Sequence, residues 1–386
     1  MLLKKHVLNM EKSKTERLHS LDSLRAIMMM LGLVLHSAAT CSISLGDWPI
    51  NDTSALNYSN DFIVGLIHSF RMPIFFLVAG FFGSMLFYER TPLKMIKNRV
   101  SRLVYPFLVF LILLWPLMLL TFGYTQFVFD GIHHAFAEVT NIFSSPFAFI
   151  PRHTFHLWFL YYLIFTTILT VLIALQMKMF PRFRKEIIKK FKWLIQNPIR
   201  RLVFFPALIF AIYFVSEITE VETSPFFFPN PISLIFYFVF YLIGWVLFKA
   251  KDVLSSFKTA DWLCVFIGTV LFCTSFFFRD EFNETILMFI SALMIWSFVF
   301  GITGLFIRYG SHYSSKLRYV SDASYWVYLI HLPLTGIIPA FLVDLNIPGS
   351  FKFFIVLVIT SLICFLSYHY VVRSTFIGKF LNGRKY

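Results

Sequence analysis

The sequence predicts an all-α, polytopic membrane protein with about ten transmembrane helices, and both composition and hydropathy support this fold class. Of the 386 residues, 58% are hydrophobic and only 14% are charged. The mean hydropathy of +0.74 is far above that of an ordinary globular domain. Apolar runs long enough to cross a bilayer recur along the whole chain.

Ten apolar runs approach or exceed the roughly 20 residues that a helix needs to cross a bilayer, and they define the predicted helices. They lie near residues 23–42, 62–88, 103–122, 156–176, 202–217, 232–248, 261–278, 285–307, 323–343 and 351–372. The longest connections, 123–155 and 177–201, are too short for a soluble domain. We therefore expect one membrane domain over 1–386, with a cytoplasmic N-terminal segment (1–22) and a cytoplasmic tail (373–386).

The basic residues, 34 Lys and Arg against 20 Asp and Glu, gather in every second connection. In a soluble protein the net charge of +14 would point to nucleic acid, but this alternation follows the positive-inside rule. We therefore expect both termini in the cytoplasm, no nucleic-acid partner, and acids such as Asp52, Asp61 and Glu220 on the outer face. The basic connection 177–201 is expected to lie on the inner leaflet among lipid headgroups.

The cysteines indicate neither disulfides nor a metal. Cys41, Cys264, Cys273 and Cys364 lie in or beside apolar runs, without a CxxC pair or a histidine at ligand spacing. HExxH, P-loop, GxGxxG and GxSxG motifs are also missing from suitable contexts. We expect no bound metal and no bound cofactor.

The first helix carries an arginine and a histidine in an otherwise apolar run. Eleven helical steps return to nearly the same face, so Asp22, Arg25, Met29, Gly32 and His36 form one stripe, with His36 roughly 16 Å beyond Arg25. An ionisable group inside a bilayer is costly and indicates function. The alternative is an interfacial arginine that extends to water and a buried histidine that donates to a carbonyl.

The second helix runs inward and carries His68, Arg71 and Pro73. At 1.5 Å per residue, His68 is roughly 9 Å deep and Arg71 roughly 13 Å deep, and His36 is at roughly the depth of His68. A mid-bilayer arginine must face the protein interior, a wet cavity or an anion. The alternative is an ion pair with an acid on another helix, but we predict no acid at that depth.

A basic cluster follows the second helix on the cytoplasmic side. Arg99 and Arg102 are separated by three residues, so on a helix both guanidinium groups should point the same way, which suits a phosphate. The positive-inside rule alone is the alternative explanation.

Two further helices carry histidines. His156 begins the fourth helix at the outer interface, where it belongs either to a site or to an aromatic belt. Tyr325, Tyr328 and His331 are spaced by three along one side of the ninth helix, with His331 roughly 12 Å from its inner boundary. His156, Tyr328, His331 and Asp22 are therefore additional site candidates.

This distribution of charge suggests acyl transfer across the membrane. A phosphorylated donor such as a coenzyme A thioester can dock on Arg25, Arg99 and Arg102 at the cytoplasmic face, and its extended arm can reach towards His36. A histidine can then act as general base on an acceptor hydroxyl, while Arg71 stabilises the oxyanion or orients an acidic acyl group.

Several segments resemble the membrane acyltransferase-3 family over essentially the whole chain. They are DSLRAIMMMLGLVLH, IHSFRMPIFFLVAGFF, the Arg99 and Arg102 pair followed by Pro106, HLWFL, and SYWVYLIHLPL. Within that family the segments look most like a branch associated with succinylation of osmoregulated periplasmic glucans. Unlike many family members, this chain shows no fused extracytoplasmic hydrolase-like domain, so we expect its outer loops to recognise the acceptor.

The resemblance implies an enzyme of the bacterial inner membrane that transfers an acyl group from succinyl-CoA or acetyl-CoA to an extracytoplasmic glucan. It also implies that His36 is the catalytic histidine, Arg25 its motif partner, and Arg99 with Arg102 the donor-side pair. The roles of His68 and Arg71 in catalysis are inferred from their depth instead.

The main alternative is a transporter in which Arg71 and the histidines form an anion and proton pathway. A lipid-linked sugar flippase is another. Against a transporter, the two halves show no matching helices broken by Gly or Pro.

Overall fold

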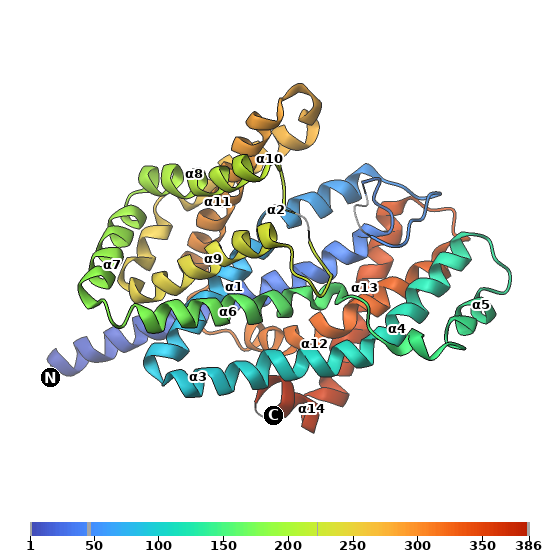
Figure 1. Cartoon of the computed structure of the whole chain (residues 1–386), viewed down its shortest axis with the longest axis horizontal. Coiled ribbons are helices and arrows are strands. Elements are labelled where there is room, and N and C mark those ends of the chain that lie inside the picture. Colours follow the sequence, from blue (N-terminus) through green and yellow to red (C-terminus); the bar gives the residue numbers. More distant parts are fainter. Residues whose placement is uncertain (1, 45–47, 222, 384–386) are drawn as a thin grey trace.

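The computed structural model describes residues 2–44, 48–221 and 223–383, with side chains from His19 onward. All regular secondary structure in these residues is helical. Helix α1 projects beyond the others at one end of the long axis, and the connection that holds α5 lies at the opposite end (Figure 1).

The ten long helices are α1 (Leu2–Ala39), α2 (Tyr58–Glu89), α4 (Tyr105–Phe129), α6 (Trp158–Gln176), α8 (Pro198–Ser216), α9 (Pro231–Lys249), α10 (Asp261–Phe277), α11 (Glu284–Tyr309), α12 (Ser315–Ile337) and α13 (Gly349–Ser367). The shorter ones are α3 (Pro92–Arg99), α5 (Ala135–Ile142), α7 (Pro181–Gln196) and α14 (Phe376–Asn382). A π-helical turn, Val100–Val104, joins α3 to α4.

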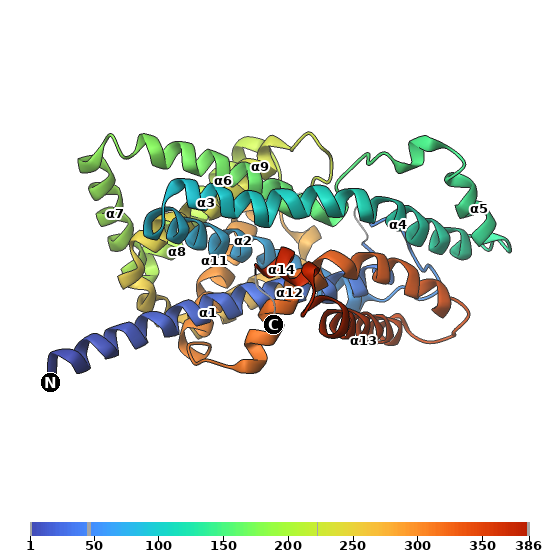
Figure 2. The ribbon, with the colours of Figure 1, turned by 90° about the horizontal axis from the view of Figure 1, so that it is seen from below.

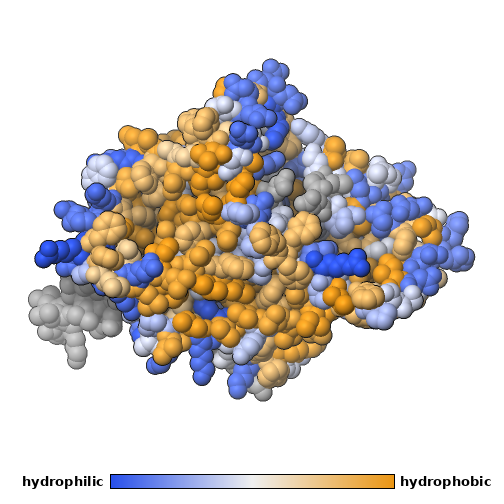
Figure 3. Space-filling model, in the orientation of Figure 1, coloured by the Kyte–Doolittle hydropathy of each residue, from blue (hydrophilic) through white to orange (hydrophobic). Residues whose placement is uncertain are grey.

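The predicted all-α membrane class is confirmed. Among the described residues, nine helices are long and apolar enough to cross a membrane, and a tenth is reached if Lys251–Lys258 and α10, bent by 66°, form one span. Apolar side chains cover most of the face seen in Figure 3, and hydrophilic ones gather towards its periphery. The cytoplasmic location of the termini stays a prediction, and Met1 and 384–386 lie outside the described residues.

Three predicted helix starts differ from the structure. The first helix begins at Leu2 rather than at 23. The third span begins at Pro92 rather than at 103, and the ninth helix begins at Ser315 rather than at 323. The first turns of α12 are polar, so hydropathy placed its start too late, whereas its actual start is set by Ser314, whose side chain accepts a hydrogen bond from the Leu317 amide. His331 consequently lies farther along its helix than predicted.

Helices α2 and α9 are in backbone contact at the centre of the bundle. A Cβ atom added to Gly80 would collide with the Tyr241 carbonyl oxygen, and one added to Gly244 would collide with the Leu77 carbonyl oxygen. Small residues permit such close approach between membrane helices. On its other sides α2 contacts α1, α10 and α11, while α1 packs against α12 and α13. Figure 2 shows α1 and α12 on the same side of the molecule.

We expect Gly80→Ala and Gly244→Ala each to destabilise the protein by about 1–3 kcal/mol, because the added methyl group would force two backbones apart. Thermal unfolding in detergent measures the effect. Gly65→Ala is the matched control, since its Cβ would lie 3.4 Å from the Phe272 ring, an ordinary contact. Three variants of equal stability would contradict the close contact.

Candidate active site

Three histidine rings from three separate segments form a continuous row inside the bundle. The ring centroids of His36 on α1 and His331 on α12 are 5.3 Å apart, and those of His331 and His156 are 5.4 Å apart. His156 lies in the short 3₁₀ turn before α6, and the Tyr328 ring packs 5.3 Å from it. The structure therefore brings together four of the residues that the sequence analysis singled out.

Arg71 lies beside this row. A Cβ atom at Gly32 would meet Nη1 of Arg71, so the guanidinium group rests against α1 one turn before His36. Arg71 is within electrostatic range of His36, Tyr237 and Tyr328. No described Asp or Glu forms an ion pair with it. The alternative of a structural ion pair is therefore not observed.

Several buried nitrogens of this group have no hydrogen-bond partner within the described part of the chain. They are Nδ1 of His36, Nδ1 of His156, Nε2 of His331 and Nε of Arg71. Leaving a buried polar group unsatisfied costs about 1–3 kcal/mol. Parts of the His36, Arg71 and Tyr328 side chains nevertheless remain accessible. Such a group can bind a polar ligand, because the ligand supplies the hydrogen bonds that the fold leaves unmade.

The other nitrogens of two histidines are held by backbone carbonyls. Nδ1 of His331 lies 3.0 Å from the Val327 oxygen and 2.8 Å from the Tyr328 oxygen. Nε2 of His156 lies 3.2 Å from the Leu329 oxygen, and the Tyr328 hydroxyl donates to the His156 carbonyl at 2.7 Å. The segment before α6 and helix α12 thus fix the orientations of the His156 and Tyr328 rings.

Phe155 turns the chain into this arrangement with a φ of 45°, the left-handed region that non-glycine residues rarely adopt. Residues held in such conformations cluster at functional sites. The unusual turn presents the adjoining His156 to α12.

The structure does not place His68 in this row. Its side chain is exposed, and it has no ring contact with the other histidines. It does lie within electrostatic range of Arg71 and His36. His68 therefore borders the histidine row.

The sequence analysis missed Trp48, whose ring stacks on His36 at 5.2 Å and 19°. Nε1 of Trp48 donates to the Thr40 hydroxyl at 3.2 Å, and its ring meets Phe122 edge-on at 5.3 Å. No spacing rule could have found this contact, because Trp48 belongs to a connection and reaches His36 only when the chain turns back.

Polar contacts hold the connection after α1 in place. The Lys352 ammonium pairs with Asp52 at 2.7 Å, and both side chains are about 4% exposed. Asp61 accepts from the Ser42 hydroxyl at 2.7 Å and from the Ser44 amide at 2.7 Å. Breaking a buried ion pair on one side costs about 3–5 kcal/mol, so these contacts anchor the segment that carries Trp48.

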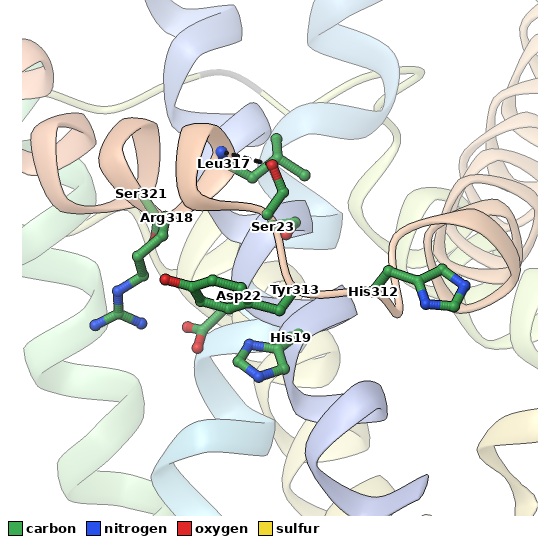
Figure 4. A pocket seen from close by; sticks show the side chains of 9 residues that line it. His19, Asp22, Ser23, His312, Tyr313, Leu317, Arg318 and Ser321 are labelled. Carbon is green, nitrogen blue, oxygen red and sulfur yellow. Dashed lines mark hydrogen bonds between the residues drawn. The ribbon is translucent and has the colours of Figure 1, made fainter. Parts of the chain in front are cut away.

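Arg25 belongs to a different group from His36. It pairs with Asp22 at 3.2 Å and lies 5.5 Å from the centre of the Phe82 ring. Figure 4 shows Asp22 and His19 of α1 beside Tyr313 in a small pocket. That pocket has a volume of only about 20 Å³, room for roughly one water molecule, so it is no substrate site.

The prediction that Arg99 and Arg102 point the same way was wrong. Arg99 donates to the Ala79 carbonyl of α2 at 3.2 Å, whereas Arg102 donates to the Leu381 carbonyl at the end of α14. The turn between them is π-helical, and its wider hydrogen-bonding ring changes the angle between positions three apart.

Arg102 lines an open surface cavity of about 360 Å³ beside α14, in which Tyr105 and Phe376 are exposed. Its volume is within the range of ligand pockets. The cavity is lined by two cations, three aromatic rings and three small or polar residues: Arg102, Lys379, Tyr105, Phe376, Phe380, Asn98, Ser101 and Gly383. This lining contains no acid. The sequence analysis missed Lys379 because only the packing of α14 brings it to Arg102.

A row of rings on α12 leads from Arg102 to the histidines. The Tyr325 hydroxyl donates to the Arg102 carbonyl at 2.8 Å. The ring centroids of Tyr325 and Tyr328 are 6.3 Å apart, as are those of Tyr328 and His331. The three residues spaced by three on α12 therefore connect Arg102 with the histidine row.

Comparison with known proteins identifies the class. A family model described as an acyltransferase domain matches residues 18–369, so the chain belongs to the acyltransferase-3 family of membrane acyltransferases. This membership favours acyl transfer over the transporter and flippase alternatives.

Curated relatives make the similarity more specific. The chain is 27% identical over 343 residues to glucans biosynthesis protein C of Salmonella gallinarum, covering 83% of this chain and 82% of that protein. It is equally identical over 345 residues, with the same coverage, to the proteins of that name from Salmonella heidelberg and Salmonella typhimurium. No solved structure matches the chain.

We expect Gly32→Ala to lower acyl transfer about 10- to 100-fold by displacing the Arg71 guanidinium from its place beside His36. Thermal stability should change by less than about 1 kcal/mol, because the displaced atoms are the end of a flexible side chain. Ester formation and thermal unfolding are measured together, with Gly65→Ala as control. Full activity in Gly32→Ala would show that this position of Arg71 is not needed.

Proposed function

We propose that this acyltransferase, in the bacterial inner membrane, transfers a succinyl group from cytoplasmic succinyl-CoA to hydroxyls of a periplasmic glucan, with acetyl-CoA as the second choice of donor. The observation that carries the proposal is the link, along α12, between the basic cavity at Arg102 and the row of histidines beside Arg71. The names of the relatives support a glucan as acceptor.

At the donor end, Arg102 and Lys379 offer positive charge to phosphates, and the aromatic rings of the cavity offer faces to an adenine base. Arg25 lies within electrostatic range of Arg102 but is paired with Asp22 and does not line the cavity. Arg99 instead supports α2 through the Ala79 carbonyl. The donor's extended arm then follows Tyr325 and Tyr328 towards the histidines.

At the reaction centre, the acceptor oxygen attacks the thioester carbonyl carbon and the carbon–sulfur bond breaks. The hydroxyl proton passes to the His36 imidazole and finally to the coenzyme A thiolate. Arg71 either stabilises the oxyanion or holds the distal carboxylate of a succinyl group. Both roles need the guanidinium where it lies, beside Gly32 and without an acidic partner among the described residues.

We expect His36→Ala to abolish acylation of periplasmic glucans, because no other group would receive the hydroxyl proton directly. Mass spectrometry of glucans from cells with matched membrane levels of each protein measures the loss, and the mass increment in wild type identifies the acyl group. His153→Ala is the control, since His153 lies near His156 but contacts Trp115 and Phe155 instead. An unchanged mass increment in His36→Ala would remove His36 from the mechanism. The absence of an increment in wild type would show that a periplasmic glucan is not the acceptor.

We expect Lys379→Ala and Arg102→Ala to raise the KM for succinyl-CoA about tenfold each, the effect of losing one charge-assisted hydrogen bond. The KM for succinyl-pantetheine, which lacks the nucleotide phosphates, should not change. Steady-state kinetics in detergent measure both donors. Lys192→Ala is the control, since Lys192 is bound to Asp252 at 2.8 Å. Equal effects on the two donors would contradict this phosphate site.

A further inference from the structure

The three histidines of the row differ in how their protons are held. A carbonyl oxygen only accepts hydrogen bonds, so Nδ1 of His331, 2.8 Å from the Tyr328 oxygen, carries its hydrogen. Nε2 of His331 is then the basic nitrogen, and it is buried without a described partner. By the same argument His156 carries its hydrogen on Nε2, which faces the Leu329 oxygen.

His36 is not held in this way. Its Nδ1 is buried without a described partner, and its ring is positioned by stacking on Trp48 rather than by a hydrogen bond to a described residue. Stacking fixes the plane of the ring but not the nitrogen that carries the proton. His36 can therefore exchange one tautomer for the other, whereas His331 cannot.

A catalytic base normally needs a third group that fixes its orientation and tautomer. His331 has two such groups, the carbonyls of Val327 and Tyr328, and His36 has none among the described residues. The ring centroids of His36 and His331 are 5.3 Å apart, and no hydrogen bond joins the two rings as they stand. Because no described residue holds a nitrogen of His36 by a hydrogen bond, the His36 ring can reorient and bring one of its nitrogens to Nε2 of His331 when the proton passes. We propose that His331 is the terminal proton acceptor of acyl transfer and that His36 passes the proton to it.

This proton transfer rests on the acyl transfer proposed above. One nitrogen of His36 takes the proton of the acceptor hydroxyl while its other nitrogen gives a proton to Nε2 of His331. The acceptor oxygen bonds to the acyl carbon and the carbon–sulfur bond breaks, which leaves a thiolate. The proton then returns from His331 through His36 to the thiolate, so the products are the ester and free coenzyme A.

The groups around His331 favour the return of the proton to the thiolate. Protonated His331 would have both N–H groups paired, one with backbone carbonyls and one with His36. Arg71 is within electrostatic range and no described carboxylate pairs with it, so the extra positive charge is unfavourable and short-lived. His331 thus holds the proton only briefly, on a lone pair whose direction is fixed, and releases it when the thiolate forms.

His331→Asn tests the proposal. The carboxamide can keep an N–H near the Val327 and Tyr328 carbonyls but has no basic nitrogen in place of Nε2. We expect kcat for transfer from succinyl-CoA to glucan to fall about 100-fold or more, the usual contribution of a general base, with KM for both substrates and thermal stability unchanged. His153→Asn is the matched control. A kcat for His331→Asn within threefold of wild type would overturn the proposal.

Two further measurements separate this role from a structural one. Added imidazole should restore part of the activity of His331→Gly, whose cavity can hold it, and should not restore His36→Ala when glucan is the acceptor. Nitrogen NMR of histidine-labelled protein, with the His331 signal assigned by its loss in His331→Asn, should show hydrogen on Nδ1 and none on Nε2. Hydrogen on Nε2 would overturn the proposal even if succinyl-CoA or glucan proved to be the wrong substrate.

Discussion

Arg71 and three imidazoles lie among membrane-spanning helices, and no described carboxylate forms an ion pair with them. The rest of the site depends on how the fold accommodates this buried, unpaired arginine. Arg71 rests against α1 where Gly32 leaves room. His331 and His156 use backbone carbonyls of α12 as partners. The remaining nitrogens stay unsatisfied, at a cost in stability, and this makes the site receptive to a polar substrate.

The side chains of the site keep their relative positions only if the segments that carry them are held in a rigid framework. The backbone contact between α2 and α9 is one part of this framework, because it fixes the position of α2, which carries Arg71. The buried pair of Lys352 and Asp52 anchors the connection in which Trp48 stacks on His36. Catalytic groups must be held within about 0.5 Å of productive geometry, and these contacts restrain the segments that carry Arg71 and Trp48.

Helix α12 joins the two ends of the proposed reaction. Near its start, Tyr325 binds the backbone of Arg102, which lines the basic cavity. Three and six residues later, Tyr328 and His331 enter the histidine row. One rigid helix therefore sets the distance between the basic cavity and the histidine row, which the proposed transfer requires.

The sequence by itself determined the all-α membrane class and nearly all of the apolar helices in the described residues, and it singled out His36 and Arg71 as candidates, because helix length and the cost of a buried charge are local properties. It could not show that His36, His331 and His156 meet, because they lie on three separate segments. It also placed the start of α12 too late, because hydropathy does not detect the Ser314 cap. Nor could it foresee that a π-helical turn separates Arg99 from Arg102. Only tertiary structure decided these points, because contacts between distant segments depend on how the helices pack against each other.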